Sequence, residues 1–262
     1  MKIEFNADTV ALVTGASKGI GYACAAQLSA CGARVAIVAR SADELERASN
    51  ALGKQGGAVQ AFSADLADPI QAVNVVEQVE RDMGPVGILV SSAGAAQRFT
   101  IDELGADALH QGMEAKYFPG VLIIDAVIKR MAQRGAGSIV NIIGQGGKRA
   151  SEIHIAGGAA NAALMLATVG YARAYASKGV RVNGINPGLT KTDRVAGGLE
   201  AESRATGKST EVLLKEKEAT IPMGRMAEPE EVANVAAFLA SDHASYVTGA
   251  IIPMDGGVAS VI

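Results

Sequence analysis

The chain has 262 residues, of which 49% are hydrophobic and 19% charged, so it can close a full hydrophobic core and is too apolar to be disordered. Its 24 basic and 27 acidic residues leave a formal net charge of −3, which disfavours a nucleic-acid or anionic-membrane surface and makes small molecules the expected partners. The 31 glycines, with no Trp and only 4% aromatic residues, suit tight turns and close packing of helices on a sheet.

The N-terminal segment and the two cysteines point to a reducing compartment. Residues 1–15 lack the charged segment and long apolar core of a signal peptide, and no stretch has the roughly 18 apolar residues that a membrane span requires. Cys24 and Cys31 lie on one predicted helix, about 10.5 Å apart along its axis, whereas a disulfide needs Cα atoms within about 7 Å. We expect a cytoplasmic protein with reduced cysteines, no membrane association and no metal site.

Short apolar runs alternate with longer amphipathic segments, which is the pattern of repeated βα units. Two helix starts are well marked: Ser41 and Glu44 form a capping box, and Asp68 precedes a proline. The pattern predicts a single α/β domain over 1–262, a doubly wound parallel sheet with helices on both faces. The seven predicted strands are residues 10–13, 34–38, 59–64, 88–91, 138–143, 181–186 and 251–254.

A glycine-rich loop follows the first predicted strand and leads directly into an amphipathic segment at 22–30. Its glycines allow a sharp turn and a close approach of the backbone to a pyrophosphate, whose charge the amides and dipole of a helix N-terminus stabilise. Such a trio alone is weak evidence, but here it lies between a first strand and a first helix, as in Rossmann-like nucleotide-binding domains. The predicted nucleotide-binding residues of the loop are Gly15, Ser17, Lys18, Gly19, Ile20 and Gly21.

The second predicted strand ends near Arg40, where a domain that prefers NAD often presents an acidic residue to the ribose 2′-hydroxyl. Arg40 and Lys18 can instead pair with a 2′-phosphate, so we predict NADP(H) in preference to NAD(H). The alternative is that both are solvated surface cations. Asp65, followed by Leu66, can bind the adenine amino group, although an Asp that merely precedes a helix fits equally well. After the fourth strand, the predicted small-residue floor for the cofactor is Ser92, Ala93 and Gly94.

The glycine-rich loop and the residues at the ends of the next predicted strands occur in an order in which the whole chain resembles the classical short-chain dehydrogenase/reductase family. The resemblance implies hydride transfer between a nicotinamide cofactor and a small carbonyl, alcohol or activated C=C compound, and a homotetramer or homodimer. It also implies that the nicotinamide carboxamide contacts Pro187, Gly188, Thr190 and Thr192, and that the poorly patterned segment at about 190–220 covers the substrate. The motifs that carry it are TGASKGIG at 14–21, Asp65, SSAG at 91–94, GSIVNI at 137–142, RVNGINPG at 181–188 and DGG at 255–257.

The family's catalytic groups, as the resemblance implies them, are a Tyr that exchanges a proton with the substrate oxygen, a Lys four residues later, a Ser and an Asn. Aligned without gaps, the Tyr and Lys positions fall on Gly157 and Asn161, and the Ser and Asn positions fall on Gly144 and Lys116. No Tyr in the chain is followed four residues later by Lys. We therefore predict an atypical member that lacks the Asn-Ser-Tyr-Lys tetrad.

Three interpretations of the missing tetrad stay open. In the first, the acid–base group has moved: a desolvated Lys116 donates the proton or stabilises an alkoxide, and His154 adds a group that titrates near neutral pH. Asn161 then supplies an amide beside the nicotinamide ribose, so it is predicted both as a catalytic and as a cofactor-binding residue. The alternative for these residues is a solvent-exposed lysine and a loop histidine. In the second, the chain is a catalytically inactive nucleotide-binding homologue that acts as a sensor or structural subunit. In the third, it catalyses a reaction, such as reduction of an activated C=C bond, that needs little protonation of an oxygen.

Overall fold

A computed structural model of the chain describes residues 2–259. Its centre is one parallel sheet in the order β3-β2-β1-β4-β5-β6-β7, so the predicted doubly wound sheet is confirmed. Every predicted strand is present, with ends that move by no more than two residues. The strands are β1 Val10–Thr14, β2 Arg34–Ala39, β3 Val59–Ser63, β4 Val86–Ser91, β5 Gly137–Ile142, β6 Val180–Pro187 and β7 Ile251–Met254.

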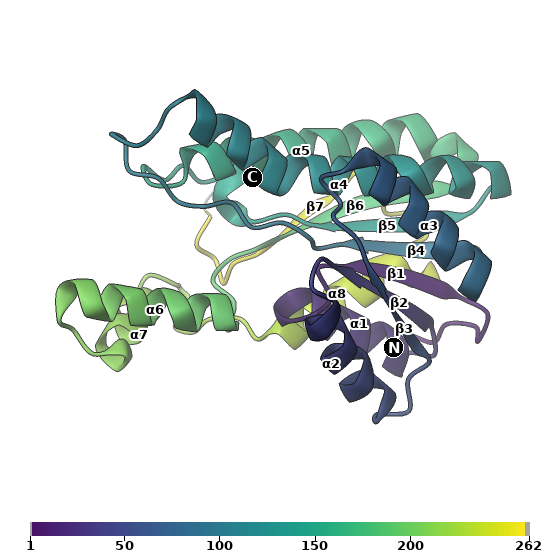
Figure 1. Ribbon diagram of the computed structural model, residues 1–262, viewed down its shortest axis with the longest axis horizontal. Coiled ribbons are helices and arrows are strands. Elements are labelled where there is room, and N and C mark those ends of the chain that lie inside the picture. The colour runs from purple at the N-terminus through teal and green to yellow at the C-terminus, as the bar shows by residue number, and fades with distance from the viewer. Residues whose placement is uncertain (1, 260–262) are drawn as a thin grey trace.

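Helices cover both faces of the sheet, with α1, α2 and α8 on one face and α3, α4 and α5 on the other (Figure 1). Short 3-10 turns η1 (Gln145–Gly147), η2 (Ala176–Lys178) and η3 (Asp242–Ala244) lie in the connections. The helices are α1 Gly19–Ala30, α2 Ala42–Gly53, α3 Pro69–Met83, α4 Ala106–Arg134, α5 Ile155–Tyr175, α6 Asp193–Thr206, α7 Thr210–Glu218 and α8 Pro229–Ala240.

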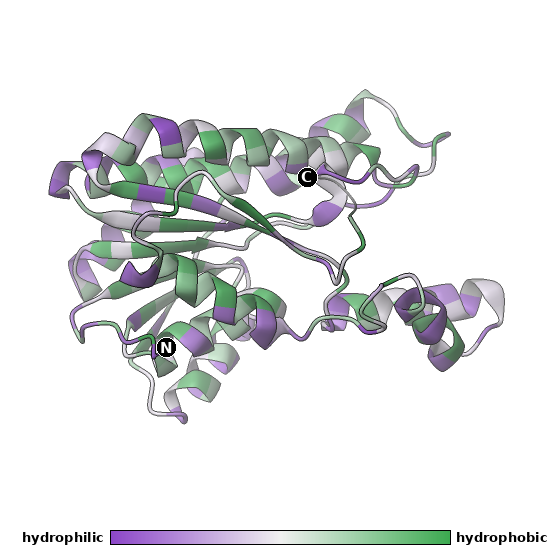
Figure 2. Ribbon diagram, turned by 180° about the vertical axis from the view of Figure 1, so that it is seen from behind, coloured by the Kyte–Doolittle hydropathy of each residue, from purple (hydrophilic) through white to green (hydrophobic). Residues whose placement is uncertain are grey.

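Each face of the sheet has its own hydrophobic core, which explains why the strands are apolar without alternation. Ala11 and Val13 of β1 pack into the core under α1, α2 and α8, whereas Val10 and Leu12 pack into the core under α3, α4 and α5. All four are fully buried. Figure 2 shows the strands as mainly hydrophobic and the polar residues as concentrated on the outer helices and loops.

The start of α2 differs from the predicted capping box. Ser41 Oγ accepts a hydrogen bond from Glu44 N at 3.3 Å, as expected for an N-cap. The reciprocal bond from Ser41 N–H to the Glu44 carboxylate is not made among the described residues, because that carboxylate is engaged by Ser17 and Lys18 instead. Only half of the predicted box is therefore formed. At α3, Asp68 caps the helix as predicted, with Ile70 N donating to its carboxylate at 2.8 Å.

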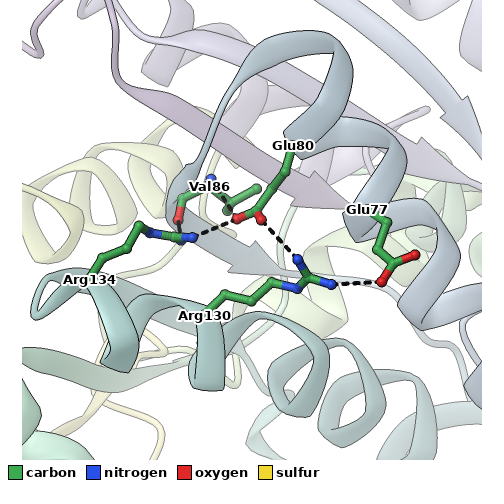
Figure 3. Close-up of polar contacts among 5 residues, drawn as sticks. All are labelled: Glu77, Glu80, Val86, Arg130 and Arg134. Carbon is green, nitrogen blue, oxygen red and sulfur yellow. Dashed lines mark hydrogen bonds and ion pairs between the residues drawn. The ribbon is translucent and has the colours of Figure 1, made fainter.

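An ion-pair network joins α3 and α4 at the start of β4 (Figure 3). Arg130 donates to Glu77 Oε1 at 2.8 Å and to Glu80 Oε2 at 3.2 Å, and Arg134 donates to Glu80 Oε1 at 3.0 Å. Glu80 Oε1 also accepts from Val86 N at 3.1 Å, and Arg134 donates to the Val86 carbonyl at 2.8 Å. The network ties the first residue of β4 to both helices, at the end of the sheet opposite the strand C-termini.

Helix α5 is apolar enough to resemble a membrane span by composition alone. The segment Ile155–Lys178 contains an 18-residue window of mean hydropathy 1.3, which the count of apolar residues in the sequence did not reveal. In the fold it packs against α4, β6 and η1, and it buries the polar side chains of Asn161 and Thr168. We therefore assign it as a core helix.

Helices α6 and α7 form a hairpin that projects away from the sheet and its covering helices (Figure 1). Leu199 of α6 and Leu213 of α7 are buried, and Lys217 of α7 pairs with Glu202 of α6 at 2.7 Å between Nζ and Oε2. The hairpin occupies most of the segment that the sequence left poorly patterned. Two regular helices therefore form where the sequence showed no clear pattern.

Candidate active site

A cleft of about 860 Å³ opens at the C-terminal ends of the strands, beside β1 and β4. The strand order reverses at this point, which is where open parallel sheets bind their ligands. Of the residues predicted to bind the cofactor, all but Asn161 line the cleft. They are Gly15, Ser17, Lys18, Gly19, Ile20, Gly21, Arg40, Asp65, Leu66, Ser92, Ala93, Gly94, Pro187, Gly188, Thr190 and Thr192.

The loop between β1 and α1 has the backbone that a pyrophosphate site needs. Gly15 and Gly19 have φ of +65° and +60°, in the left-handed region that side chains disfavour. A Cβ at Gly21 would overlap the Gly15 carbonyl, so the first turn of α1 packs directly on the loop. Helix α1 has no side-chain cap and no acidic residue in its first turn. Its N–H groups are therefore free to bind an anion, and this chain fits a dinucleotide diphosphate.

The floor of the cleft is fixed to β1 by one hydroxyl group. Thr14 Oγ1 accepts hydrogen bonds from Ser92 N at 3.0 Å and from Ala93 N at 3.1 Å. Because Gly15 follows Thr14 directly, these bonds also set the distance between the phosphate loop and the small-residue floor. A Cβ at Gly15 would lie only 2.9 Å from the Ser92 carbonyl oxygen, so the two loops touch.

At the end of β2, Arg40 is exposed and lines the cleft together with Lys18. Glu44 lies there as well, although its place in the sequence indicates only a role in capping the helix. Lys18 Nζ is 3.1 Å from Glu44 Oε1, and Ser17 Oγ donates to Glu44 Oε2 at 3.1 Å. The end of the cleft predicted to hold a 2′-phosphate therefore contains two cations and one carboxylate.

The loop after β6 lies at the other end of the cleft. Gly188 N donates to the Met254 carbonyl at 2.9 Å, and Thr190 Oγ1 donates to the Gly188 carbonyl at 3.3 Å. A Cβ at Gly19 would lie 3.4 Å from Thr192 Cγ2, so this loop reaches the phosphate loop across the cleft. Arg194 and Gln111 also line the cleft, and nothing in the sequence pattern distinguished them from surface residues.

Lys116 of α4 is half-buried and lines the cleft. A Cβ at Gly94 would lie 3.6 Å from Lys116 Cδ, and a Cβ at Gly144 would lie 3.8 Å from Lys116 Nζ. Within residues 2–259 no carboxylate lies within 4.0 Å of the ammonium group. Burial, with a smaller effect of Arg194, lowers the pKa of Lys116 to about 8. Lys116 is therefore not a solvent-exposed surface lysine.

His154 precedes α5 and fills space next to two glycines. A Cβ at Gly146 would lie 2.9 Å from His154 Cδ2, and a Cβ at Gly157 would lie 2.7 Å from His154 Nε2 and 2.8 Å from Ala96 Cβ. His154 Nδ1 is buried and has no hydrogen-bond partner among the described residues. Burial, followed by the charges of Lys116 and Arg98, lowers the pKa of His154, so the imidazole is neutral at pH 7.

Asn161 of α5 is 1% exposed and lies behind η1, outside the lining of the cleft. A Cβ at Gly144 would lie 3.1 Å from Asn161 Nδ2, and a Cβ at Gly146 would lie 3.5 Å from the same atom. Asn161 Oδ1 is buried without a hydrogen-bond partner in residues 2–259. The three predicted catalytic residues thus surround the glycines at 144, 146 and 157, where Lys116 alone faces the open cleft.

Comparisons with known proteins agree with this fold. A family model described as enoyl-(acyl carrier protein) reductase matches residues 15–259. The D-threitol dehydrogenase of Mycolicibacterium smegmatis is 35% identical over 248 residues, which cover 95% of this chain and 92% of that protein. The L-sorbose reductase of Gluconobacter frateurii, solved with NADPH and L-sorbose, has a TM-score of 0.94 and 30% identity over 100% of both chains.

A second solved structure has the same fold. It is an NADPH-bound short-chain oxidoreductase of Pseudomonas aeruginosa, reported to contain an atypical catalytic center. It has a TM-score of 0.89 and 31% identity, and the match covers 99% of this chain and 100% of that one. The solved structures agree with the seven-stranded parallel sheet and its covering helices described above. This chain belongs to the short-chain dehydrogenase/reductase family of NAD(P)-dependent oxidoreductases.

Proposed function

We propose that this chain is an NADP(H)-dependent oxidoreductase of a small carbonyl or alcohol compound, in which Lys116, His154 and Asn161 replace the family's usual tetrad. One observation carries the proposal: these polar side chains fill the space beside the glycines at 144, 146 and 157. In an inactive site there would be no reason for buried polar side chains to fill the space beside these glycines. The nicotinamide, when bound, supplies or accepts the hydride.

Lys116 is the proposed acid–base group. With a pKa of about 8, it is charged at neutral pH yet releases its proton far more readily than a solvated lysine does. In the direction of reduction, the Lys116 ammonium donates a proton to the substrate oxygen as negative charge develops there. In the direction of oxidation, the neutral amine accepts the hydroxyl proton. A substrate oxygen beside Gly144 would lie within reach of Nζ.

His154 and Asn161 hold the substrate side of this arrangement. The imidazole fills the volume that a side chain at Gly157 would otherwise use, so the glycine at this position makes room for His154. The neutral imidazole and the Asn161 amide each carry one buried atom, Nδ1 and Oδ1, that has no hydrogen-bond partner in the part of the chain that the structure describes. Buried polar atoms are rarely left unpaired, so we expect substrate, a cofactor hydroxyl or ordered water to bind them. Asn161 would then bind this partner from its position behind η1, since it does not line the cleft.

The preference for NADP(H) rests on Arg40 and Lys18, which line the cleft at the end of β2 with no acidic residue at the strand end itself. An arginine fork suits the oxygens of a 2′-phosphate. The solved structures from Gluconobacter and Pseudomonas contain NADPH, which supports the same preference.

The remaining parts of the proposal concern the whole chain. We expect residues 1–262 to act as one domain in the cytoplasm, with the α6–α7 hairpin closing over the substrate. The hairpin joins the body through a bridge between Thr190 and Ala227 and an ion pair between Lys191 and Glu228. We also expect a homotetramer or homodimer. Exposed apolar side chains on α4 and α5, such as Phe118 and Leu166, suit such a contact.

The test is a pH profile of the Lys116→Met variant. NADPH binding is measured first by nicotinamide fluorescence, and carbonyl, alcohol and enone compounds are then screened for turnover. For the wild type, kcat/KM for reduction should fall as the pH rises through about 8, because only the protonated lysine donates. Lys116→Met should lower kcat about 10²- to 10⁴-fold and abolish this dependence. The matched control is Lys129→Met on the same helix, whose lysine pairs with Asp125 on the surface.

The outcomes separate the interpretations. Unchanged rates and an unchanged pH profile in both Lys116→Met and His154→Ala would refute the relocated acid–base group. Turnover of enones alone, insensitive to Lys116, would favour reduction of an activated C=C bond. Tight binding of NADPH without any turnover would favour an inactive nucleotide-binding homologue.

A further inference from the structure

The Glu44 carboxylate contacts Lys18, one of the two cations predicted to bind the 2′-phosphate. Its Oε1 atom lies 3.1 Å from Lys18 Nζ, and its Oε2 atom accepts a hydrogen bond from Ser17 Oγ at 3.1 Å. Lys18 and Ser17 belong to the phosphate loop, whereas Glu44 lies in the first turn of α2. These contacts join residues 26 and 27 positions apart in the chain, and no local pattern requires them.

This contact competes with the predicted cofactor contact. Lys18, Arg40 and Glu44 all line the same end of the cleft. A 2′-phosphate needs the Lys18 ammonium for itself, and a carboxylate beside it would repel a group that carries up to two negative charges. The hydrogen bonds from Lys18 and then Ser17 lower the pKa of Glu44, so the carboxylate stays charged at neutral pH.

Glu44 has a second partner within its own helix. Ser41 is the N-cap of α2, and its N–H is the group that a glutamate three residues later binds in a capping box. That bond is not made among the described residues while Glu44 contacts Lys18. A carboxylate that leaves Lys18 can therefore turn back to Ser41 N–H and complete the box, which offsets part of the cost of breaking the ion pair.

We propose that Glu44 is a competing anion in the 2′-phosphate subsite: it must leave Lys18 before NADP(H) binds, and it thereby limits how strongly this chain prefers NADP(H) over NAD(H). The proposal rests on the proposed use of Lys18 and Arg40 for the 2′-phosphate. NAD(H) carries a ribose 2′-hydroxyl instead, which can donate to the same carboxylate. Glu44 thus hinders one cofactor and not the other.

The test compares Kd values for NADPH and NADH, and for the fragments 2′-AMP and 5′-AMP, in the wild type, Glu44→Gln and Glu44→Ala. Glu44→Gln should tighten NADPH and 2′-AMP about five- to tenfold and leave NADH and 5′-AMP unchanged or weaker. Glu44→Ala also removes the hydrogen-bonding group, and it should shift these Kd values in the same direction. Agreement between the two variants would assign the effect to the charge of Glu44 rather than to its hydrogen bonds. Glu46→Gln removes an exposed carboxylate from the same helix and should change none of these affinities.

Failure of the proposed role of Glu44 can be distinguished from failure of the proposed cofactor preference. Equal or weaker NADPH and 2′-AMP binding in both Glu44 variants would overturn the role of Glu44, whichever cofactor the wild type prefers. A wild type that prefers NADH, with NADPH binding still tightened by Glu44→Gln, would refute the proposed cofactor preference and support the role of Glu44. Lys18→Met serves as the reference, because it should weaken NADPH and 2′-AMP binding if this subsite holds the phosphate.

Discussion

The two ends of the cleft use glycine for different physical reasons. At the phosphate end, Gly15 and Gly19 have left-handed φ values, and Gly21 packs on the carbonyl of the loop itself. At the substrate end, Gly144 has an ordinary φ of −58° and Gly157 is not among the glycines with positive φ. There the absent side chains leave room for Asn161 and His154. Gly15 and Gly21 thus serve the backbone at the phosphate end, whereas Gly144 and Gly157 make room for neighbouring side chains at the substrate end.

This difference predicts how each end responds to substitution. A clash with backbone cannot be relieved by a second mutation, because the carbonyl has no alternative position without unfolding the loop. A clash with a side chain can be relieved by truncating that side chain. Alanine scanning of the glycines, with and without second-site changes, therefore tests whether the two ends really differ.

The largest effect is expected for Gly21→Ala. Its Cβ would overlap the Gly15 carbonyl oxygen and lie 2.7 Å from the carbonyl carbon, so either α1 or the phosphate loop must move. We expect a loss of about 1–3 kcal/mol in the free energy of unfolding and a rise of about 100-fold in the Kd for NADPH. Thermal unfolding and nicotinamide fluorescence measure the two quantities.

The control for this prediction is Gly53→Ala at the end of α2, where an added Cβ meets nothing within 4 Å. It should leave NADPH binding unchanged and alter stability by less than about 1 kcal/mol. If Gly21→Ala binds NADPH as tightly as Gly53→Ala does, the backbone of this loop is not the reason for its glycine.

An intermediate and reversible effect is expected for Gly146→Ala. The added Cβ would lie 2.9 Å from His154 Cδ2, and the next neighbours are also side-chain atoms of His154 and Asn161. Alone it should displace His154, lower turnover about tenfold and cost about 1 kcal/mol of stability. In the His154→Ala background the same substitution should have little effect, which gives a coupling energy of about 1 kcal/mol in a double-mutant cycle.

Gly170→Ala is the matched control within α5, because nothing lies within 4 Å of its added Cβ. It should be neutral in both backgrounds. Equal effects of Gly146→Ala with and without His154 would show that this glycine serves the backbone after all, and the contrast between the two ends would disappear.

The parts of the structure that were predictable from sequence are those that local patterns determine. Apolar runs predicted all seven strands, and the position of the glycine trio between a strand and a helix predicted the loop between β1 and α1 that lines the cleft. The carboxylate of Glu44 was assigned to its helix cap because the competing partners, Ser17 and Lys18, come from another βα unit. Likewise, the sequence pattern did not show that Asn161 is buried and outside the lining of the cleft, since the depth of a side chain depends on tertiary packing.

The smallest effect on the site is expected for Glu80→Ala, at the far end of the sheet. It removes the acceptor for Arg130, Arg134 and Val86 N, so the free energy of unfolding should fall by about 1–3 kcal/mol. Glu77→Ala removes one exposed ion pair to Arg130 and should cost less than about 1 kcal/mol. Both variants should keep the wild-type Kd for NADPH and the wild-type pH profile. A change in either would mean that lost stability alone perturbs the cleft, and the glycine variants would then have to be compared at matched stability before the two ends could be distinguished.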